Sequence, residues 1–228
     1  MVRYIRDTTG RFAERPYYEP EELNRECESI MVGFLRSIYR EVKFPVATED
    51  LKKLIERDAD DLDCYADLSE YGADVEGVTE FYPGRKPVVK IAAELTEDER
   101  RENRLRTTLT HEHGHVHFHA YLFTMNQAQG RLFQRARIDR IICKRNTMLD
   151  APQSDWMEWQ AGFACGAFLM PQGPLSAAIR RIGEELRLPA GKVSSSWLRT
   201  RRGMLKRSST AKGRWLQLCS TPRTWLAS

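Results

Sequence analysis

The sequence has no histidine outside positions 111–119, although five histidines occur among its 228 residues. It has no apolar run long enough to span a membrane, and its start lacks the apolar region of a secretory signal peptide. Its five cysteines, an odd number, form no CxxC pair. These absences argue against a membrane protein or a disulfide-stabilised secreted one, and they predict a cytoplasmic protein with reduced cysteines.

Charge is distributed unevenly along the chain. Positions 171–228 carry twelve lysines and arginines against two acidic residues, a net charge of +10, whereas positions 1–170 carry a net charge of −6. A basic end on an acidic body indicates two parts with different roles. We expect a folded domain at 1–171 and a basic segment at 172–228, in which a helix precedes a poorly ordered tail. A nucleic-acid role for this tail stays open, because basic ends are more often simply solvated.

The periodicity of apolar residues predicts an α+β fold. Two amphipathic helices come first, a long one beginning at Pro20 and a shorter one capped by Thr48. The pattern then changes to alternation, which predicts a strand at 62–68 and a β-hairpin formed by 77–82 and 87–93. The expected sheet is therefore small and mainly antiparallel.

Further helices are expected after the hairpin. Thr96 and Glu99 can form a capping box that opens a long helix through the histidine-rich segment. Positions 124–153 are polar and irregular, and Ser154 can cap the next helix, which ends before Pro171. Small residues in that helix would let a neighbouring helix approach closely. They are Ala161, Gly162, Ala164, Gly166 and Ala167.

The segment HEHGH at 111–115 matches the pattern H-E-x-x-H. On a helix, His111 and His115 lie about 40° apart and one turn along, so both imidazoles can reach one metal ion. Glu112 then lies beside them, where it can take a proton from a water molecule activated by the metal. This arrangement is that of zinc peptidases, and it predicts a single zinc ion and a catalytic base. Gly114 would allow a close approach of this helix to the sheet.

The other histidines of the segment point elsewhere. We expect His113 and His117 to pack in the core or at the surface. His119 lies on the same stripe as His111, but two turns of helix separate the two residues by about 12 Å, too far to share one ion. A supporting position behind the ligands and a position on the substrate side both stay open for His119.

A catalytic zinc ion usually has three protein ligands, so one more is needed. The extended motif with a third histidine does not fit, because Tyr121 occupies that position. Glu158, in the first turn of the next helix, is the best candidate, followed by Asp155 and then Cys143. Spacing alone does not decide, because the helix dipole also favours an acidic residue near a helix start.

Two segments resemble the paired motifs of the ImmA/IrrE family of metallopeptidases: RLRTTLTHEHGHVHFH at 104–119 and EWQAGFACGAFLMP at 158–171. In that family a helix with T-L-x-H-E-x-G-H often carries a further histidine at the position of His119. A later helix has a glutamate, an alanine, small residues and a terminal Met-Pro. The likeness covers roughly positions 20–171.

The resemblance implies a zincin-like domain in which N-terminal helices and a small sheet precede the H-E-x-x-H helix and a glutamate-bearing helix. It implies that His111, His115 and Glu158 bind Zn²⁺ and that Glu112 is the catalytic base. It also implies cleavage of a protein substrate such as a DNA-binding transcriptional repressor. The chain departs from the family at Gly162, where asparagine is usual. The segment VSSSWLRTRRG is at best a degraded form of the family's C-terminal helix-turn-helix, so no DNA-binding residues are carried over.

Two functions therefore compete. The first is a zinc-dependent endopeptidase of regulatory type, in which an exposed edge of the hairpin holds an extended substrate. Tyr121 and Arg104 are the residues to examine as oxyanion partners, although the sequence assigns neither. The second is a binding protein with a structural zinc site and a basic tail that contacts nucleic acid or another partner. Glu112 favours the first, because a structural site has no need of an acid beside its first ligand.

Overall fold

The computed structural model describes residues 2–130, 138–144, 148, 151–152 and 154–185. Within these residues the fold is α+β, as the periodicity predicts. Its elements in chain order are β1 (Arg3–Arg6), β2 (Glu14–Tyr17), α1 (Pro20–Tyr39), α2 (Thr48–Asp58), β3 (Asp61–Ala66), the 3-10 turn Ser69–Tyr71, β4 (Val75–Phe81), β5 (Val88–Ala92), α3 (Ala93–Glu97), the 3-10 turn Glu99–Arg101, α4 (Glu102–Gly130), β6 (Asp139–Lys144), α5 (Trp156–Leu169) and α6 (Gln172–Glu185).

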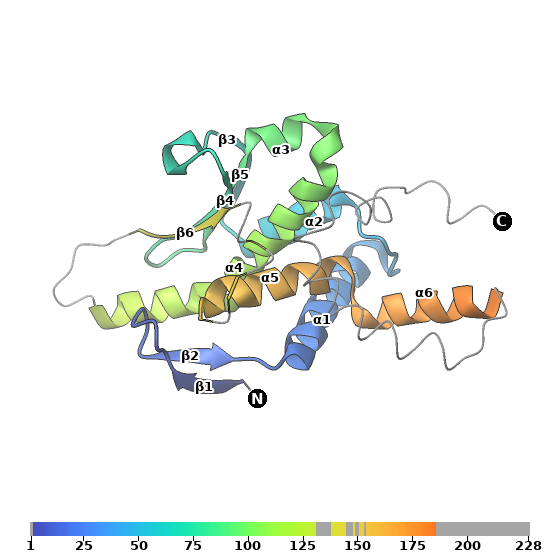
Figure 1. The fold of residues 1–228 in the computed structure, drawn as a ribbon, viewed down its shortest axis with the longest axis horizontal. Coiled ribbons are helices and arrows are strands. Elements are labelled where there is room, and N and C mark those ends of the chain that lie inside the picture. The colour runs from blue at the N-terminus through green and yellow to red at the C-terminus, as the bar shows by residue number, and fades with distance from the viewer. Residues whose placement is uncertain (1, 131–137, 145–147, 149–150, 153, 186–228) are drawn as a thin grey trace.

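The strands form an antiparallel pair, β1–β2, and a four-stranded sheet in the order β3-β5-β4-β6. In the larger sheet β4 is antiparallel to both β5 and β6, whereas β3 is parallel to β5. The predicted hairpin is confirmed as β4 and β5, with Gly77 opposite Ile91. In the view of Figure 1 the sheet lies above helices α4 and α5, and the β1–β2 hairpin lies below them. Helices α4 and α5 thus lie between the four-stranded sheet and the β1–β2 hairpin.

Strand β6 lies within the stretch 124–153 that was expected to be irregular, and that expectation is wrong. Ile141 and Cys143 are buried and their neighbours are exposed, which is the alternation of an edge strand. This alternation is only six residues long and lies among many arginines, so the strand is hard to recognise from the sequence. Because β6 pairs with β4 and β3 pairs with β5, both edges of the hairpin are covered. The expectation that an exposed hairpin edge holds a substrate is therefore wrong as well.

The three residues expected to cap helices do not do so. The Thr48 hydroxyl, in the first turn of α2, donates to Glu102 Oε1 at 2.7 Å. Thr96 lies inside α3, and its hydroxyl donates to the carbonyl oxygen of Cys64 at 2.7 Å. Ser154 precedes Asp155, the residue at the N-cap of α5. Two of these hydroxyls thus bind another element, which the local sequence does not reveal.

Helices α4 and α5 pack closely through small residues, as expected. A Cβ atom at Gly114 would lie 3.1 Å from the Cα of Ala161, so Gly114 allows close approach to α5 and not, as predicted, to the sheet. The glycine at the contact between helix and sheet is Gly77 of β4. A Cβ atom there would lie 2.5 Å from Oε1 of Glu112. The lack of a side chain at Gly114 and at Gly77 therefore lets α4 lie close to α5 on one side and to β4 on the other.

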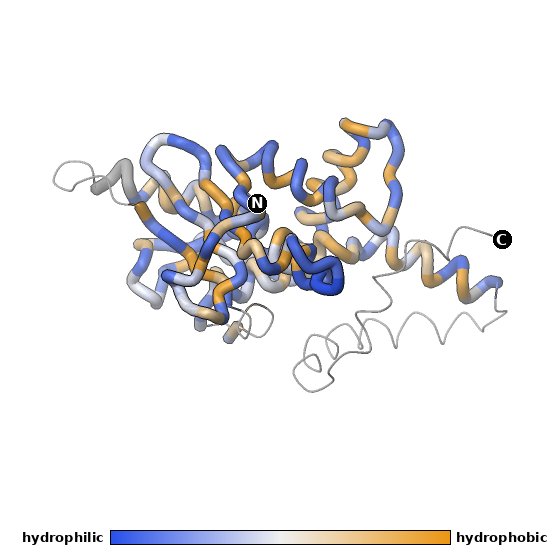
Figure 2. Tube along the Cα trace, turned by 90° about the horizontal axis from the view of Figure 1, so that it is seen from above, coloured by the Kyte–Doolittle hydropathy of each residue, from blue (hydrophilic) through white to orange (hydrophobic). Residues whose placement is uncertain are grey.

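The predicted helix at the start of the basic segment is present as α6, which extends beyond the rest of the described chain at one end (Figures 1 and 2). Hydrophobic and hydrophilic residues follow one another along it in Figure 2. The tail beyond residue 203 lies outside the described residues. No helix in the described part of the chain has both the length and the apolar content needed to cross a membrane.

Candidate metal centre

Two histidines of α4 turn their rings toward one point. The Nε2 atoms of His111 and His115 lie 3.1 Å apart, and both side chains are fully buried. One turn of α-helix separates the two residues, which places both rings on the face that packs against α5. This is the arrangement that the H-E-x-x-H spacing predicts.

Glu158, in the first turn of α5, completes a triangle with them. Its Oε2 atom lies 3.2 Å from Nε2 of His111, and its Oε1 atom lies 3.3 Å from Nε2 of His115. Burial acts to raise the pKa of Glu158, but His115 and His111 outweigh it and hold that pKa well below its ordinary value. The carboxylate is therefore charged and faces both rings.

The triangle has the dimensions of a metal site. Tetrahedral zinc with Zn–N bonds of about 2.0–2.1 Å places neighbouring ligand atoms about 3.3 Å apart. The two Nε2 atoms lie 3.1 Å apart, and each faces a different oxygen of Glu158, at 3.2 Å for His111 and 3.3 Å for His115. An imidazole pair and a carboxylate are donors that suit zinc. The described residues could therefore hold a metal ion, and one such group consists of His111, His115 and Glu158.

Glu112 lies beside this group, fully buried between α4 and strand β4. The Thr79 hydroxyl of β4 donates to Oε2 of Glu112 at 2.6 Å. The other oxygen, Oε1, is buried and has no hydrogen-bond partner among the described residues. Burial raises the pKa of Glu112 to about 7, and the charge of Glu158 adds to this effect. A carboxyl group that titrates near neutral pH and has one unpartnered oxygen is suited to accept a proton.

The structure separates the three candidates for the third ligand. Cys143 on β6 lies near His111 and Glu112 in a second cluster that could hold a metal. Burial raises the pKa of the Cys143 thiol well above its ordinary value. Asp155 is exposed and belongs to neither cluster of described residues. Among the described residues, Glu158 and Cys143 therefore each belong to a group that could hold a metal ion, and Asp155 belongs to none.

His113 and His117 lie on other faces of α4 and make packing contacts. Nε2 of His113 lies 3.0 Å from Oδ2 of Asp58, and its ring packs against Phe168. His117 is partly exposed and lies 3.4 Å from Glu26. Neither belongs to a group of described residues that could hold a metal.

His119 lies directly behind His115. The Nδ1 atoms of the two rings are 3.0 Å apart, and Nε2 of His119 lies 3.0 Å from Oε1 of Gln160 on α5. Burial, with His115 adding to it, lowers the pKa of His119 well below its ordinary value, so this ring is neutral. Of the two positions left open by the sequence, His119 occupies the one behind the ligands.

The two residues considered as oxyanion partners have other contacts. Arg104 forms an ion pair with Glu76 of β4. The Tyr121 hydroxyl accepts a hydrogen bond of 3.1 Å from the hydroxyl of Tyr4 on β1. Tyr121 also lines a groove of about 480 Å³ between α4 and the β4–β5 loop, beside Phe81 and other residues.

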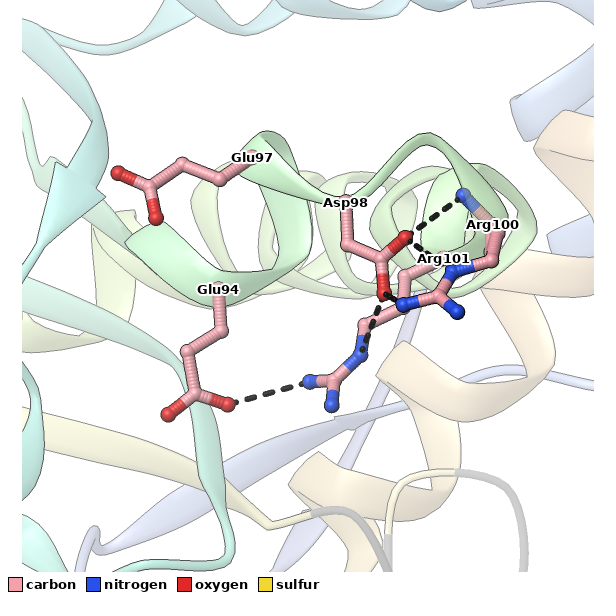
Figure 3. Close-up of a pocket in the computed structure, with 5 residues that line it drawn as sticks. All are labelled: Glu94, Glu97, Asp98, Arg100 and Arg101. Atoms are coloured by element: carbon pink, nitrogen blue, oxygen red, sulfur yellow. Dashed lines mark hydrogen bonds and ion pairs between the residues drawn. The ribbon is translucent and has the colours of Figure 1, made fainter.

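The hollow shown in Figure 3 is lined by charged residues that do not belong to the candidate metal centre. Its lining residues are Glu94, Glu97, Asp98, Arg100 and Arg101, and its volume is about 420 Å³. Asp98 pairs with Arg100 at 2.8 Å, and Glu94 pairs with Arg101 at 3.1 Å. Four of the five charged side chains that line the hollow therefore lie in ion pairs.

Sequence reasoning missed Thr79 and Gln160. Alternation does not single out Thr79, because all seven residues of β4 are buried. No local signal marks Gln160, whose contact with His119 depends on how α5 docks on α4.

Comparison with known proteins gave no relative: no family model matches the chain, and a search of curated proteins found no match. The likeness to the ImmA/IrrE family therefore depends on the two sequence motifs.

Proposed function

We propose that this protein is a zinc-dependent endopeptidase of regulatory type, similar to the ImmA/IrrE metallopeptidases. The observation that supports this most is the triangle of His111, His115 and Glu158, with separations of 3.1–3.3 Å, beside the unpartnered oxygen of Glu112. A metal-binding triangle alone would suit a structural site. The adjacent buried carboxyl group supplies what hydrolysis requires in addition.

The imidazoles of His111 and His115 and the Glu158 carboxylate would hold the ion, which would supply Lewis acidity to activate a water molecule and polarise a carbonyl group. Glu112 accepts the proton of the attacking water on Oε1 and can deliver it to the leaving amine. Thr79 holds the other oxygen at 2.6 Å and so fixes the plane of the carboxylate. A pKa of about 7 lets Glu112 act in both directions near neutral pH.

We infer that the substrate is a cytoplasmic regulatory protein, such as a DNA-binding repressor. The family likeness of the two motifs supports this substrate class. Four cysteines of the described chain are free and buried, which suits a reducing compartment: Cys27, Cys64, Cys143 and Cys165.

Glu112→Gln tests the proposal, because it keeps the size and polarity of the side chain and removes the base. The wild-type protein and the variant are each co-expressed with the products of neighbouring genes, and each product is examined for truncation. We expect one product to be shortened by the wild type only. The variant should retain zinc and its fold while cleavage falls by about 10²–10⁴-fold.

A second function, a binding protein with a structural metal, has one observation in its favour. His111, His115 and Glu112 are fully buried, and β6 covers the edge of β4 beside them. A Glu112→Gln protein with full biological activity would establish this alternative and exclude the peptidase.

A further inference from the structure

We infer that His119 and Gln160 are positioning residues that hold His115 as a metal ligand, and that strand β2 anchors them from behind. The inference rests on the proposed metal site but not on peptidase activity. Its basis is an unbroken series of contacts from β2 to the ligand. The series runs through the Pro16 carbonyl, Gln160, His119 and His115, with separations of 3.1, 3.0 and 3.0 Å.

The backbone of β2 fixes the direction of the first hydrogen bond. A carbonyl oxygen can only accept, so the atom of Gln160 that faces Pro16 is the amide nitrogen, Nε2. The amide oxygen of Gln160 must then face His119, and it can only accept as well. Nε2 of His119 is therefore the protonated nitrogen of that ring.

The direction of these hydrogen bonds continues to the ligand. A ring that carries its single proton on Nε2 accepts at Nδ1, so the Nδ1 atom of His115 that faces Nδ1 of His119 at 3.0 Å must carry the proton. The lone pair of His115 is then on Nε2, the atom that faces His111 and Glu158. The carbonyl group of Pro16 thus selects the tautomer of His115 through the side chains of Gln160 and His119.

His111 lacks such support. Its Nδ1 atom is buried and has no hydrogen-bond partner among the described residues. A metal-binding histidine that donates its second nitrogen to a fixed acceptor is held in tautomer and orientation, and loss of that acceptor typically costs about 10–100-fold in metal affinity. His115 is therefore the anchored ligand of the pair, and His119 with Gln160 supplies the anchor.

Nitrogen-15 NMR of the histidines in the full-length protein tests the tautomers directly. The wild type is examined as purified, with its zinc content measured, and signals are assigned with single His variants. We expect His115 to carry its proton on Nδ1 and His119 on Nε2. A proton on Nε2 of His115, or on Nδ1 of His119, would overturn the inference whether or not the protein cleaves anything.

Zinc affinity, measured by competition with a chelator, tests the consequence. His119→Phe keeps an aromatic ring against Trp156, and Gln160→Met keeps side-chain length, but each removes the hydrogen bonds. We expect each to weaken zinc binding about 10–100-fold while circular dichroism shows a native fold. His117→Gln, on another face of α4, is the matched control and should bind zinc as the wild type does.

The outcomes separate the inference from the proposed function. Wild-type affinity in both folded variants would overturn the relay and leave the peptidase proposal standing. Weakened zinc binding in both variants, together with a Glu112→Gln protein of full activity, would support the relay and overturn the peptidase. If a variant fails to fold, the tautomers of the wild type still decide.

Discussion

Glu158 is the residue on which the metal site depends most, because it is the one candidate ligand supplied by a second helix. Each of its oxygens faces one imidazole, at 3.2 and 3.3 Å. We therefore expect Glu158→Ala to lose most of its zinc during purification. Asp155→Ala, at an exposed position one turn earlier, should retain about one ion per chain. Metal analysis of the two purified variants makes the comparison, and the reverse result would show that the ligand assignment is wrong.

The sequence predicts the residues of this site to different degrees. Helical spacing alone predicts that the side chains of His111 and His115 lie close together with Glu112 beside them, because the geometry of one turn is independent of the rest of the fold. Glu158 needs the family likeness, since spacing leaves Asp155 and Cys143 as alternatives. Gln160 touches His119 only because α5 docks on α4, and such contacts between distant segments leave no local pattern.

Elements with a sustained periodic pattern are the ones that the sequence predicts well. Helices α1 and α4 and the β4–β5 hairpin all lie close to their predicted places. Strand β6 does not, because its alternation is only six residues long, and it becomes a strand by pairing with β4. The predictions of helix caps at Thr48 and Thr96 are wrong for a related reason, because both hydroxyls donate hydrogen bonds to other elements.

Glu80 of β4 ties the central strand to both of its neighbours. Its carboxylate accepts from Arg140 of β6 at 2.7 Å and pairs with Lys90 of β5 at 3.1 Å. Burial acts to raise the pKa of Glu80, but the hydrogen bonds from Arg140 and from the other partners outweigh it and lower that pKa to about 2. The stability from these contacts is therefore complete above the ordinary value of 4.5 and is lost as pH falls toward 2.

We expect Glu80→Gln to lower the free energy of unfolding at pH 7 by about 2 kcal/mol, because it removes hydrogen bonds to charged groups. The difference from the wild type should shrink as pH falls from 4.5 toward 2. Denaturant unfolding across this pH range measures it, with Glu97→Gln at an exposed position of α3 as the control. A difference that does not change with pH would mean that the charge of Glu80 does not hold the strands together.

At the scale of the molecule, the N-terminal hairpin is part of the body that carries the candidate metal site and is not an appendage. The indole nitrogen of Trp156 donates to Asp7 at 3.1 Å, and Phe12 packs against Phe123 and Trp156. Gln160 bonds to Pro16 of the same hairpin. The first residues of the chain therefore hold the start of α5, the helix that carries Glu158. The family likeness, which begins near position 20, gives no indication of this role.

The basic end of the chain differs from this body in composition. Positions 171–228 have a net charge of +10 and few periodic apolar residues beyond about 203. We therefore expect truncation after residue 203 to leave the melting temperature and the zinc content unchanged. Calorimetry and metal analysis of the truncated protein measure both, and a large drop in melting temperature would show that the tail packs on the core. If the tail binds nucleic acid, binding should weaken steeply as salt is raised, because contacts to phosphates release counterions, and it should vanish on truncation.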